Sequence, residues 1–179
     1  SVRAGAGGAD VARGRAVDGE AARTGELAAD PPPVNLLCVA TLTPRKGHDV
    51  LLDALVDVGT RAWRLDCVGS AERSPATAAQ LRAHAARLGL AEDVHWHGEL
   101  TDRELAAAFD AADLFVLPAR HEGYGMAVAE ALARGLPVVA TRVGAVEQLV
   151  GDDAGIVVPP DDVEALRSAL TRVLGDAQC

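Results

Sequence analysis

The chain alternates between short runs of consecutive apolar residues and stretches in which apolar residues recur at helical spacing. VNLLCVA (Val34–Ala40) is an apolar run of strand length, whereas HDVLLDALVDVG (His48–Gly59) places Leu51, Leu52 and Leu55 on one helical face. Strands that are apolar on both sides are typical of parallel sheets covered by helices on two faces. The pattern therefore predicts an α/β domain with a doubly wound, Rossmann-like parallel sheet.

This alternation continues nearly to the C-terminus. The predicted strands are Val34–Ala40, Trp63–Gly69, Asp93–Gly98, Asp113–Pro118 and Leu136–Thr141. The predicted helices are His48–Gly59, Pro75–Leu88, Thr101–Ala112, Gly125–Arg134 and a last one that follows GIVVPPDD (Gly155–Asp162) and runs to about Leu174. Ser74 is predicted as an N-cap with Pro75 at the first helical position, and Thr101 as an N-cap with Glu104 at the capping-box position.

The character of the sequence changes near Pro31. Residues 1–30 are mostly Gly, Ala, Arg, Asp and Glu without periodicity, and they are followed by three consecutive prolines. With 179 residues in all, we expect a linker over 1–33, one domain over 34–175 and a short tail over 176–179.

Composition narrows the classes of partner. The formal charge of −9 argues against nucleic acid, although a small anionic ligand needs only a few local donors. No apolar run is long enough to span a bilayer. The cysteines Cys38, Cys67 and Cys179 show no CxxC spacing, which favours a reduced compartment without structural zinc. We therefore expect a cytoplasmic protein.

Basic residues follow the first predicted strand in ATLTPRKGH (Ala40–His48). In a doubly wound sheet, ligands bind at the carboxyl ends of the strands, and the N–H groups of a helix start attract anions. Arg45 and Lys46 at such a position favour a diphosphate site over a solvated basic turn.

The segment EGYGMAVAE (Glu122–Glu130) suggests a second part of the same site. Gly123 and Gly125 give G-x-G, but the third position of a dinucleotide fingerprint is Val128, so the glycines instead allow backbone amides to approach a phosphate. Carboxylates bind vicinal hydroxyl groups well, and Glu122 and Glu130 could each bind such a pair. Two such carboxylates beside an anion site indicate a nucleotide sugar, although Glu130 alone could equally be a surface residue of its helix.

Other chemistry finds little support. His95 and His97 share a face of one predicted strand without a third ligand at metal spacing, and His121 does not begin an HExxH helix. No G-x-S-x-G elbow is present, so a hydrolase triad is not expected. We expect neither a metal nor another cofactor.

These motifs resemble those of a known family. EGYGMAVAEALARGLPVVAT is similar to the E-x7-E signature of retaining glycosyltransferases with the GT-B fold, in glycosyltransferase family 4 (group 1). VATLTPRKGHDVLLDAL resembles the phosphate-binding loop of the family's donor domain, and GAVEQLV and GIVVPPDDVEAL match later landmarks in order.

The resemblance implies roles for individual residues. Glu122 is expected beside the donor sugar, Glu130 at the ribose hydroxyls, and Lys46 at the diphosphate, where it stabilises the leaving group. Backbone amides around Tyr124, Gly125 and Met126 are expected at the same phosphates, and the base near VGSAER, which begins at Val68 and includes Gly69, and near HGEL. Thr141 and Gly144 are expected near the edge of the site, with Glu147 as a supporting residue.

Two departures from the family pattern stand out. Thr41 occupies a position where many members have an arginine that contacts the diphosphate, and Arg45 could compensate for it. Only the C-terminal, donor-binding half of a GT-B enzyme is recognisable, and GGAD (Gly7–Asp10) resembles the segment that precedes the interdomain linker.

The resemblance thus implies transfer of a hexosyl unit from a UDP-, GDP- or ADP-linked sugar, with an N-terminal acceptor domain as the missing partner. Membrane association of the full enzyme stays open. A non-catalytic nucleotide-sugar-binding module is the main alternative. A sugar-nucleotide epimerase or a phosphorylase is another, but a phosphorylase would need a lysine for pyridoxal phosphate, and Lys46 is the only lysine.

Overall fold

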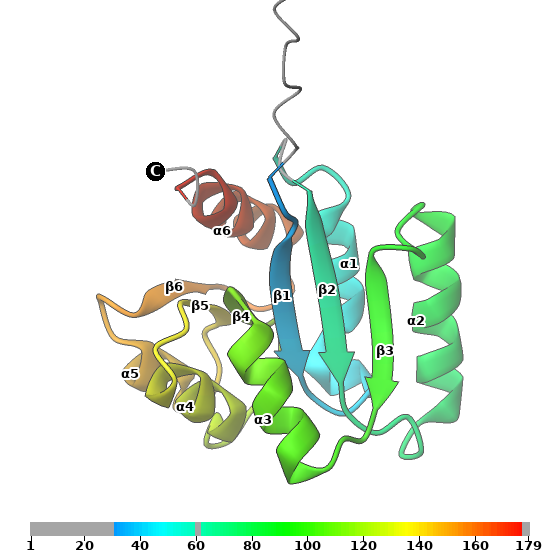
Figure 1. The fold of residues 1–179 in the computed structure, drawn as a ribbon, viewed down its shortest axis with the longest axis horizontal. Helices are drawn as coiled ribbons and strands as arrows, with labels where there is room; N and C mark the ends of the chain where they lie inside the picture. Colours follow the sequence, from blue (N-terminus) through cyan, green and yellow to red (C-terminus); the bar gives the residue numbers. More distant parts are fainter. Residues whose placement is uncertain (1–30, 60–61, 177–179) are drawn as a thin grey trace, which may run out of the picture. The chain divides into compact units, whose positions relative to one another are not determined.

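The computed structural model describes residues 31–59 and 62–176, and these form an α/β unit around one parallel sheet (Figure 1). The predicted linker over residues 1–30, with its GGAD segment, and tail residues 177–179 lie outside the described residues. The strands are β1 (Val34–Val39), β2 (Trp63–Val68), β3 (Val94–Gly98), β4 (Leu114–Leu117), β5 (Val138–Thr141) and β6 (Gly155–Val158). The helices are η1 (Pro44–Lys46), α1 (His48–Leu55), α2 (Pro75–Arg87), α3 (Asp102–Ala111), α4 (Met126–Ala133), α5 (Val146–Val150) and α6 (Val163–Asp176).

The predicted fold class is confirmed. The strand order is β3-β2-β1-β4-β5-β6 with parallel pairing throughout, which is the doubly wound arrangement. Helices α1 and α2 lie on one face with α6, whereas α3, α4 and α5 cover the other (Figure 1). Strands β1, β4 and β5 are buried almost throughout, as their continuous apolar sequences require.

Two short helical elements were not predicted. The 3-10 turn η1 and the five-residue helix α5 are too short to show an apolar periodicity, so the sequence is typical of a loop at both places. Segment β6 was expected only as a lead into the last helix, yet it pairs with β5 over four residues at the edge of the sheet.

Both residues predicted as N-caps precede their helices, but only one of them caps the backbone with its side chain. Thr101 and Glu104 form the reciprocal capping box that their spacing predicts. Ser74 does precede α2, with Pro75 at the first helical position, but its hydroxyl bonds to the Thr77 hydroxyl at 2.7 Å instead of capping the backbone.

Candidate functional site

The loops after β1 and β4 lie side by side because the strand order reverses between these two strands. The chain leaves β1 toward β2 and leaves β4 toward β5, so a crevice forms where the two connections diverge. The backbone N–H groups of Arg120 and His121 donate to the carbonyl oxygen of Arg45 at 2.8 and 3.2 Å. The two loops that carry the predicted diphosphate and sugar residues are thus bonded to each other.

At this crevice Lys46 and Glu122 form an ion pair. Lys46 Nζ donates to Glu122 Oε2 at 2.6 Å, and both side chains are about one-fifth exposed. The other carboxylate oxygen, Oε1, accepts from the backbone N–H of Gly123 at 3.1 Å and of Gly125 at 3.4 Å. An ammonium group and the N–H groups at the start of α4 therefore converge on one anion, which in this structure is the Glu122 carboxylate.

The charge state of Glu122 follows from these contacts. Burial by itself raises the pKa of the carboxyl group, but the hydrogen bond and charge of Lys46, with the Gly125 and Gly123 amides, outweigh it. The net result is a pKa below the ordinary value. Glu122 is therefore an anion at neutral pH, bound by the kind of donors that suit a phosphate.

Two glycines give this cradle its shape. Gly125 precedes α4 with a φ of +67°, a left-handed conformation that glycine adopts without strain, and its N–H donates to Glu122. Gly144 has a φ of +52°, and a Cβ there would lie 2.0 Å from the carbonyl oxygen of Glu122. The segment after β5 thus packs against the backbone of the Glu122 loop, at the position where the sequence predicted an edge of the site.

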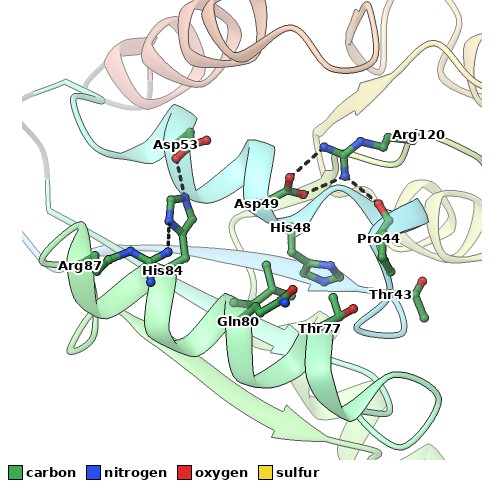
Figure 2. A pocket seen from close by; sticks show the side chains of 11 residues that line it. Thr43, Pro44, His48, Asp49, Asp53, Thr77, Gln80, His84, Arg87 and Arg120 are labelled. Atoms are coloured by element: carbon green, nitrogen blue, oxygen red, sulfur yellow. Dashed lines mark hydrogen bonds and ion pairs between the residues drawn. The ribbon is translucent and has the colours of Figure 1, made fainter.

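Arg120, which no sequence pattern indicated, joins three segments around the crevice. Its guanidinium donates to both carboxylate oxygens of Asp49 at 2.9 and 2.8 Å and to the carbonyl oxygen of Pro44 at 2.7 Å (Figure 2). It also pairs with Asp161 at 2.5 Å. The hydrogen bonds to Asp49 raise the pKa of Arg120 despite partial burial, so its positive charge is constant. Arg120 fixes the Lys46 loop against the Glu122 loop.

Beside this arginine, a cavity of about 450 Å³ lies between α1 and α2 (Figure 2). His48 lines it from the start of α1 yet is only 2% exposed. Its Nε2 lies 3.7 Å from Cys38 Sγ, and its Nδ1 has no hydrogen-bond partner among the described residues. Burial lowers the pKa of His48 to about 4, which Lys46 favours and Asp49 opposes. The ring is neutral at neutral pH.

Glu130 lies in a separate groove of about 480 Å³ between α3 and α4. Apolar side chains, among them Val39, Leu105 and Met126, line this groove. Glu130 Oε1 pairs with Arg134 at 2.6 Å, and the side chain stays about half exposed. A half-exposed carboxylate beside an apolar wall suits the hydroxyl groups and the ring of a nucleoside.

The remaining predicted donor residues divide between pockets. Thr41 and Arg45 line a pocket of about 540 Å³ with Lys46, and Arg45 also borders the Glu122 pocket of about 320 Å³. Gly69 lies against the carbonyl of Ala40, where a Cβ would come within 2.1 Å. Tyr124 and Met126 are 84% and 78% exposed at the start of α4.

Thr141 and Glu147, the other residues expected around the edge of the site, make different contacts. Thr141 is 1% exposed, and its hydroxyl donates to the carbonyl oxygen of Ala119, so it is a buried link between β5 and the end of β4. Glu147 forms an ion pair with Arg142 at 2.9 Å on the surface. Because Ala119 directly precedes Arg120, the hydrogen bond to Ala119 keeps Thr141 beside the Glu122 loop while its side chain faces inward.

Besides Arg120, two arginines near the site were not singled out in the sequence, although Arg73 is the last residue of VGSAER. Arg73, in the β2–α2 loop, lines the same pocket as Thr41 and Lys46, and Arg134 holds Glu130. Arg134 stands four residues after Glu130, a spacing at which opposite charges on a helix meet, and this signal could have found it. No comparable local signal marks Arg73.

Comparison with known proteins identifies the family. Residues 33–176 match the family described as group 1 glycosyl transferases. This chain belongs to the group 1 glycosyltransferases. The D-inositol 3-phosphate glycosyltransferase of Segniliparus rotundus is 36% identical over 154 residues, which cover 84% of this chain and 34% of the relative. The lipopolysaccharide core mannosyltransferase LpsB of Rhizobium meliloti is 32% identical over 84% of this chain and 44% of its own length.

Solved structures agree with this glycosyltransferase assignment. HepE of Anabaena, in complex with UDP and glucose, has a TM-score of 0.75 at 26% identity, over 82% of this chain and 40% of that one. The C-terminal domain of the group 1 protein LpcC of Francisella tularensis has the same fold, with a TM-score of 0.74 at 21% identity, over 83% of this chain and 79% of that domain. The chain spans less than half the length of the two curated relatives named above.

Metal binding and membrane spanning find no support within residues 31–59 and 62–176. In that range, no cluster of three or more His, Cys, Asp and Glu side chains is placed to hold a metal ion. None of the helices there has the length and apolar character needed to cross a membrane.

Proposed function

We propose that this chain is the donor-binding half of a retaining, family 4 glycosyltransferase that transfers a hexosyl unit from a nucleotide-diphosphate sugar to an acceptor hydroxyl. One observation carries the proposal: Lys46 and the N–H groups of Gly123 and Gly125 converge on a single anion where the strand order reverses. In the proposal the diphosphate of the donor takes the place of the Glu122 carboxylate.

The nature of the donor is supported by relatives. Solved structures of HepE contain UDP, UDP with glucose, and UDP-glucose. Several curated relatives are named mannosyltransferases, among them one described as GDP-mannose-dependent. Those names include both UDP and GDP. Binding measurements with a panel of UDP, GDP and ADP sugars would therefore identify the hexose and the base of this chain's donor.

The chemistry proposed for this half is charge stabilisation of the leaving diphosphate. Cleavage of the glycosidic bond moves negative charge onto the diphosphate, and Lys46 with the positive end of α4 would stabilise that charge. Glu122, released from Lys46, would then accept hydrogen bonds from the sugar hydroxyls. The proposal involves no metal ion and assigns no carboxylate nucleophile.

The acceptor half is proposed as the partner domain, because this chain covers only part of each relative. The same fact favours one alternative, a nucleotide-sugar-binding module without transfer activity of its own. The two differ in turnover: the module binds donor but releases no nucleotide diphosphate when acceptors and an acceptor domain are supplied. We also propose a cytoplasmic location.

Calorimetric titration of the chain with UDP, GDP, ADP and their common sugars tests the donor site. We expect saturable binding of one diphosphate that is weakened by both Lys46→Ala and Glu130→Ala. In a complete enzyme, Lys46→Ala should lower kcat more than Glu130→Ala does, because the leaving-group charge develops at Lys46. No binding by a folded chain, or equal losses of kcat, would count against these assignments.

A further inference from the structure

Arg134 connects the two walls of the groove that contains Glu130. From the end of α4 its Nε donates to Glu130 Oε1 at 2.6 Å, and its Nη1 donates to Asp110 Oδ1 of α3, also at 2.6 Å. The guanidinium lies 5.4 Å from the centre of the Phe109 ring, and Nη1 also reaches the carbonyl oxygen of Ala106 at 3.5 Å. The Arg134 guanidinium therefore links the Glu130 carboxylate on α4 to helix α3.

Arg134 lies against a buried aromatic pair. Phe109 is 2% exposed and stacks on Phe115 of β4, with ring centres 5.8 Å apart. At the backbone, Arg134 follows the last residue of α4, where a cation is favoured by the carbonyl groups of the helix end. The hydrogen bonds to Glu130 and then Asp110 raise the pKa of Arg134, so its charge is constant. Arg134 thus holds Glu130 at a fixed place relative to the core.

Only one oxygen of the Glu130 carboxylate is used in this way. Within the part of the chain that the structure describes, Oε1 meets Arg134 and Oε2 has no hydrogen bond. The carboxylate borders the apolar groove between Leu105 and Met126 and is left with capacity to accept hydrogen bonds from a ligand. An unheld glutamate would lose side-chain freedom when it bound that ligand, whereas this one is already ordered.

We propose that Arg134 is a positioning residue that makes Glu130 selective for the ribose hydroxyl groups of the nucleotide. This inference rests on the proposed function, which supplies the nucleotide. It predicts that loss of Arg134 weakens the recognition of ribose specifically, beyond any general effect of one lost positive charge on an anionic ligand.

The test compares ribose with deoxyribose forms of one nucleotide. The probes are whichever of UDP, GDP and ADP binds best, and its 2′-deoxy and 3′-deoxy forms, titrated calorimetrically against the 179-residue chain. In the unaltered chain, removal of a hydroxyl that bonds to a charged partner should weaken binding about tenfold or more. In Arg134→Gln that preference should fall to within about twofold of the preference left in Glu130→Ala, because both variants lack an ordered carboxylate.

A matched control is Arg64→Gln, which breaks an exposed pair with Asp66 (3.1 Å) on β2. It should keep the full preference for ribose. If Arg134→Gln weakens all three nucleotides equally and keeps the preference, Arg134 acts only through its charge and the inference is wrong.

If the unaltered chain binds the diphosphate without preferring ribose, this inference fails while the donor site stands. If the folded chain binds no nucleoside diphosphate, the proposed function fails and this inference fails with it.

Discussion

At the scale of single residues, His48 shows how burial changes the chemistry of a side chain. It is 2% exposed at the start of α1, its Nε2 faces Cys38, and burial lowers its pKa to about 4. Since the pKa of a solvated histidine is about 6.5, the unfolded chain binds a proton in a range of pH where the folded chain does not.

This difference predicts a loss of stability in mild acid. The contribution of His48 is fully present above the unfolded pKa and is lost as the pH falls from about 6.5 toward 4, by about 2 kcal/mol at pH 5. Urea unfolding at pH 7.5 and pH 5 measures it. The neutral variant His48→Gln should lose less stability between the two pH values, and parallel losses in both proteins would contradict the assignment.

Gly144 is a position where the absence of a side chain allows two loops to pack closely. Gly144→Ala should unfold at lower urea concentration than Gly135→Ala, by about 2 kcal/mol or more in free energy of unfolding. Both glycines have positive φ, +52° and +74°, but a Cβ at Gly144 meets the Glu122 carbonyl oxygen at 2.0 Å, whereas at Gly135 nothing lies within 4 Å. Equal costs would show that the Glu122 loop can move away freely.

At the scale of elements, the start of α4 binds a carboxylate from its own loop. Glu122 neutralises Lys46 and accepts hydrogen bonds from Gly123 and Gly125, so the site is electrostatically satisfied before a ligand arrives. A diphosphate at the same donors has to displace Glu122, and it would also be repelled by the charge that it displaces.

This competition predicts a gain from neutralising Glu122. In Glu122→Gln, the affinity for a nucleoside diphosphate without sugar should rise about tenfold, because a neutral amide competes less well for charged donors. Calorimetry with the diphosphate and with its sugar form measures both, and the sugar should add less affinity in the variant. Glu92→Gln, an exposed change that removes the same charge between α2 and β3, is the control. Unchanged or weaker diphosphate binding in Glu122→Gln would refute the competition.

At the scale of the whole domain, a ligand in the crevice would contact loops from both halves of the sheet. The loops after β1 and β4 belong to the two halves that meet where the strand order reverses, and Arg120 already joins them to Asp161 after β6. Binding at such a place stabilises the folded state as a unit.

We therefore expect the nucleoside diphosphate to raise the melting temperature. At a concentration of 100 times the dissociation constant the gain is about 2.7 kcal/mol, or roughly 10 °C for a domain of this size. Differential scanning calorimetry measures it, and Lys46→Ala at the same concentration should lose most of the gain. A shift that survives in Lys46→Ala would place the ligand elsewhere.

Fold class and family can both be recognised in the amino-acid sequence. The alternation of apolar runs and helical periodicity predicts the parallel sheet, because each element has to bury its own apolar face wherever it lies. The same alternation located Lys46 and Glu122 after the carboxyl ends of strands. The E-x7-E motif from Glu122 to Glu130, together with the loop around Lys46 and the later landmarks in the same order, indicates the group 1 glycosyltransferases.

Which of these groups come into contact depends on the packing of distant segments. Lys46 and Glu122 are 76 residues apart and Arg120 and Asp49 are 71 apart, so the sequence holds no local signal for either pair. The inward turn of Thr141 and the burial of His48 likewise depend on which neighbouring segments pack over them. Local patterns fix what an element must bury, whereas contacts between distant segments depend on how all the elements pack together.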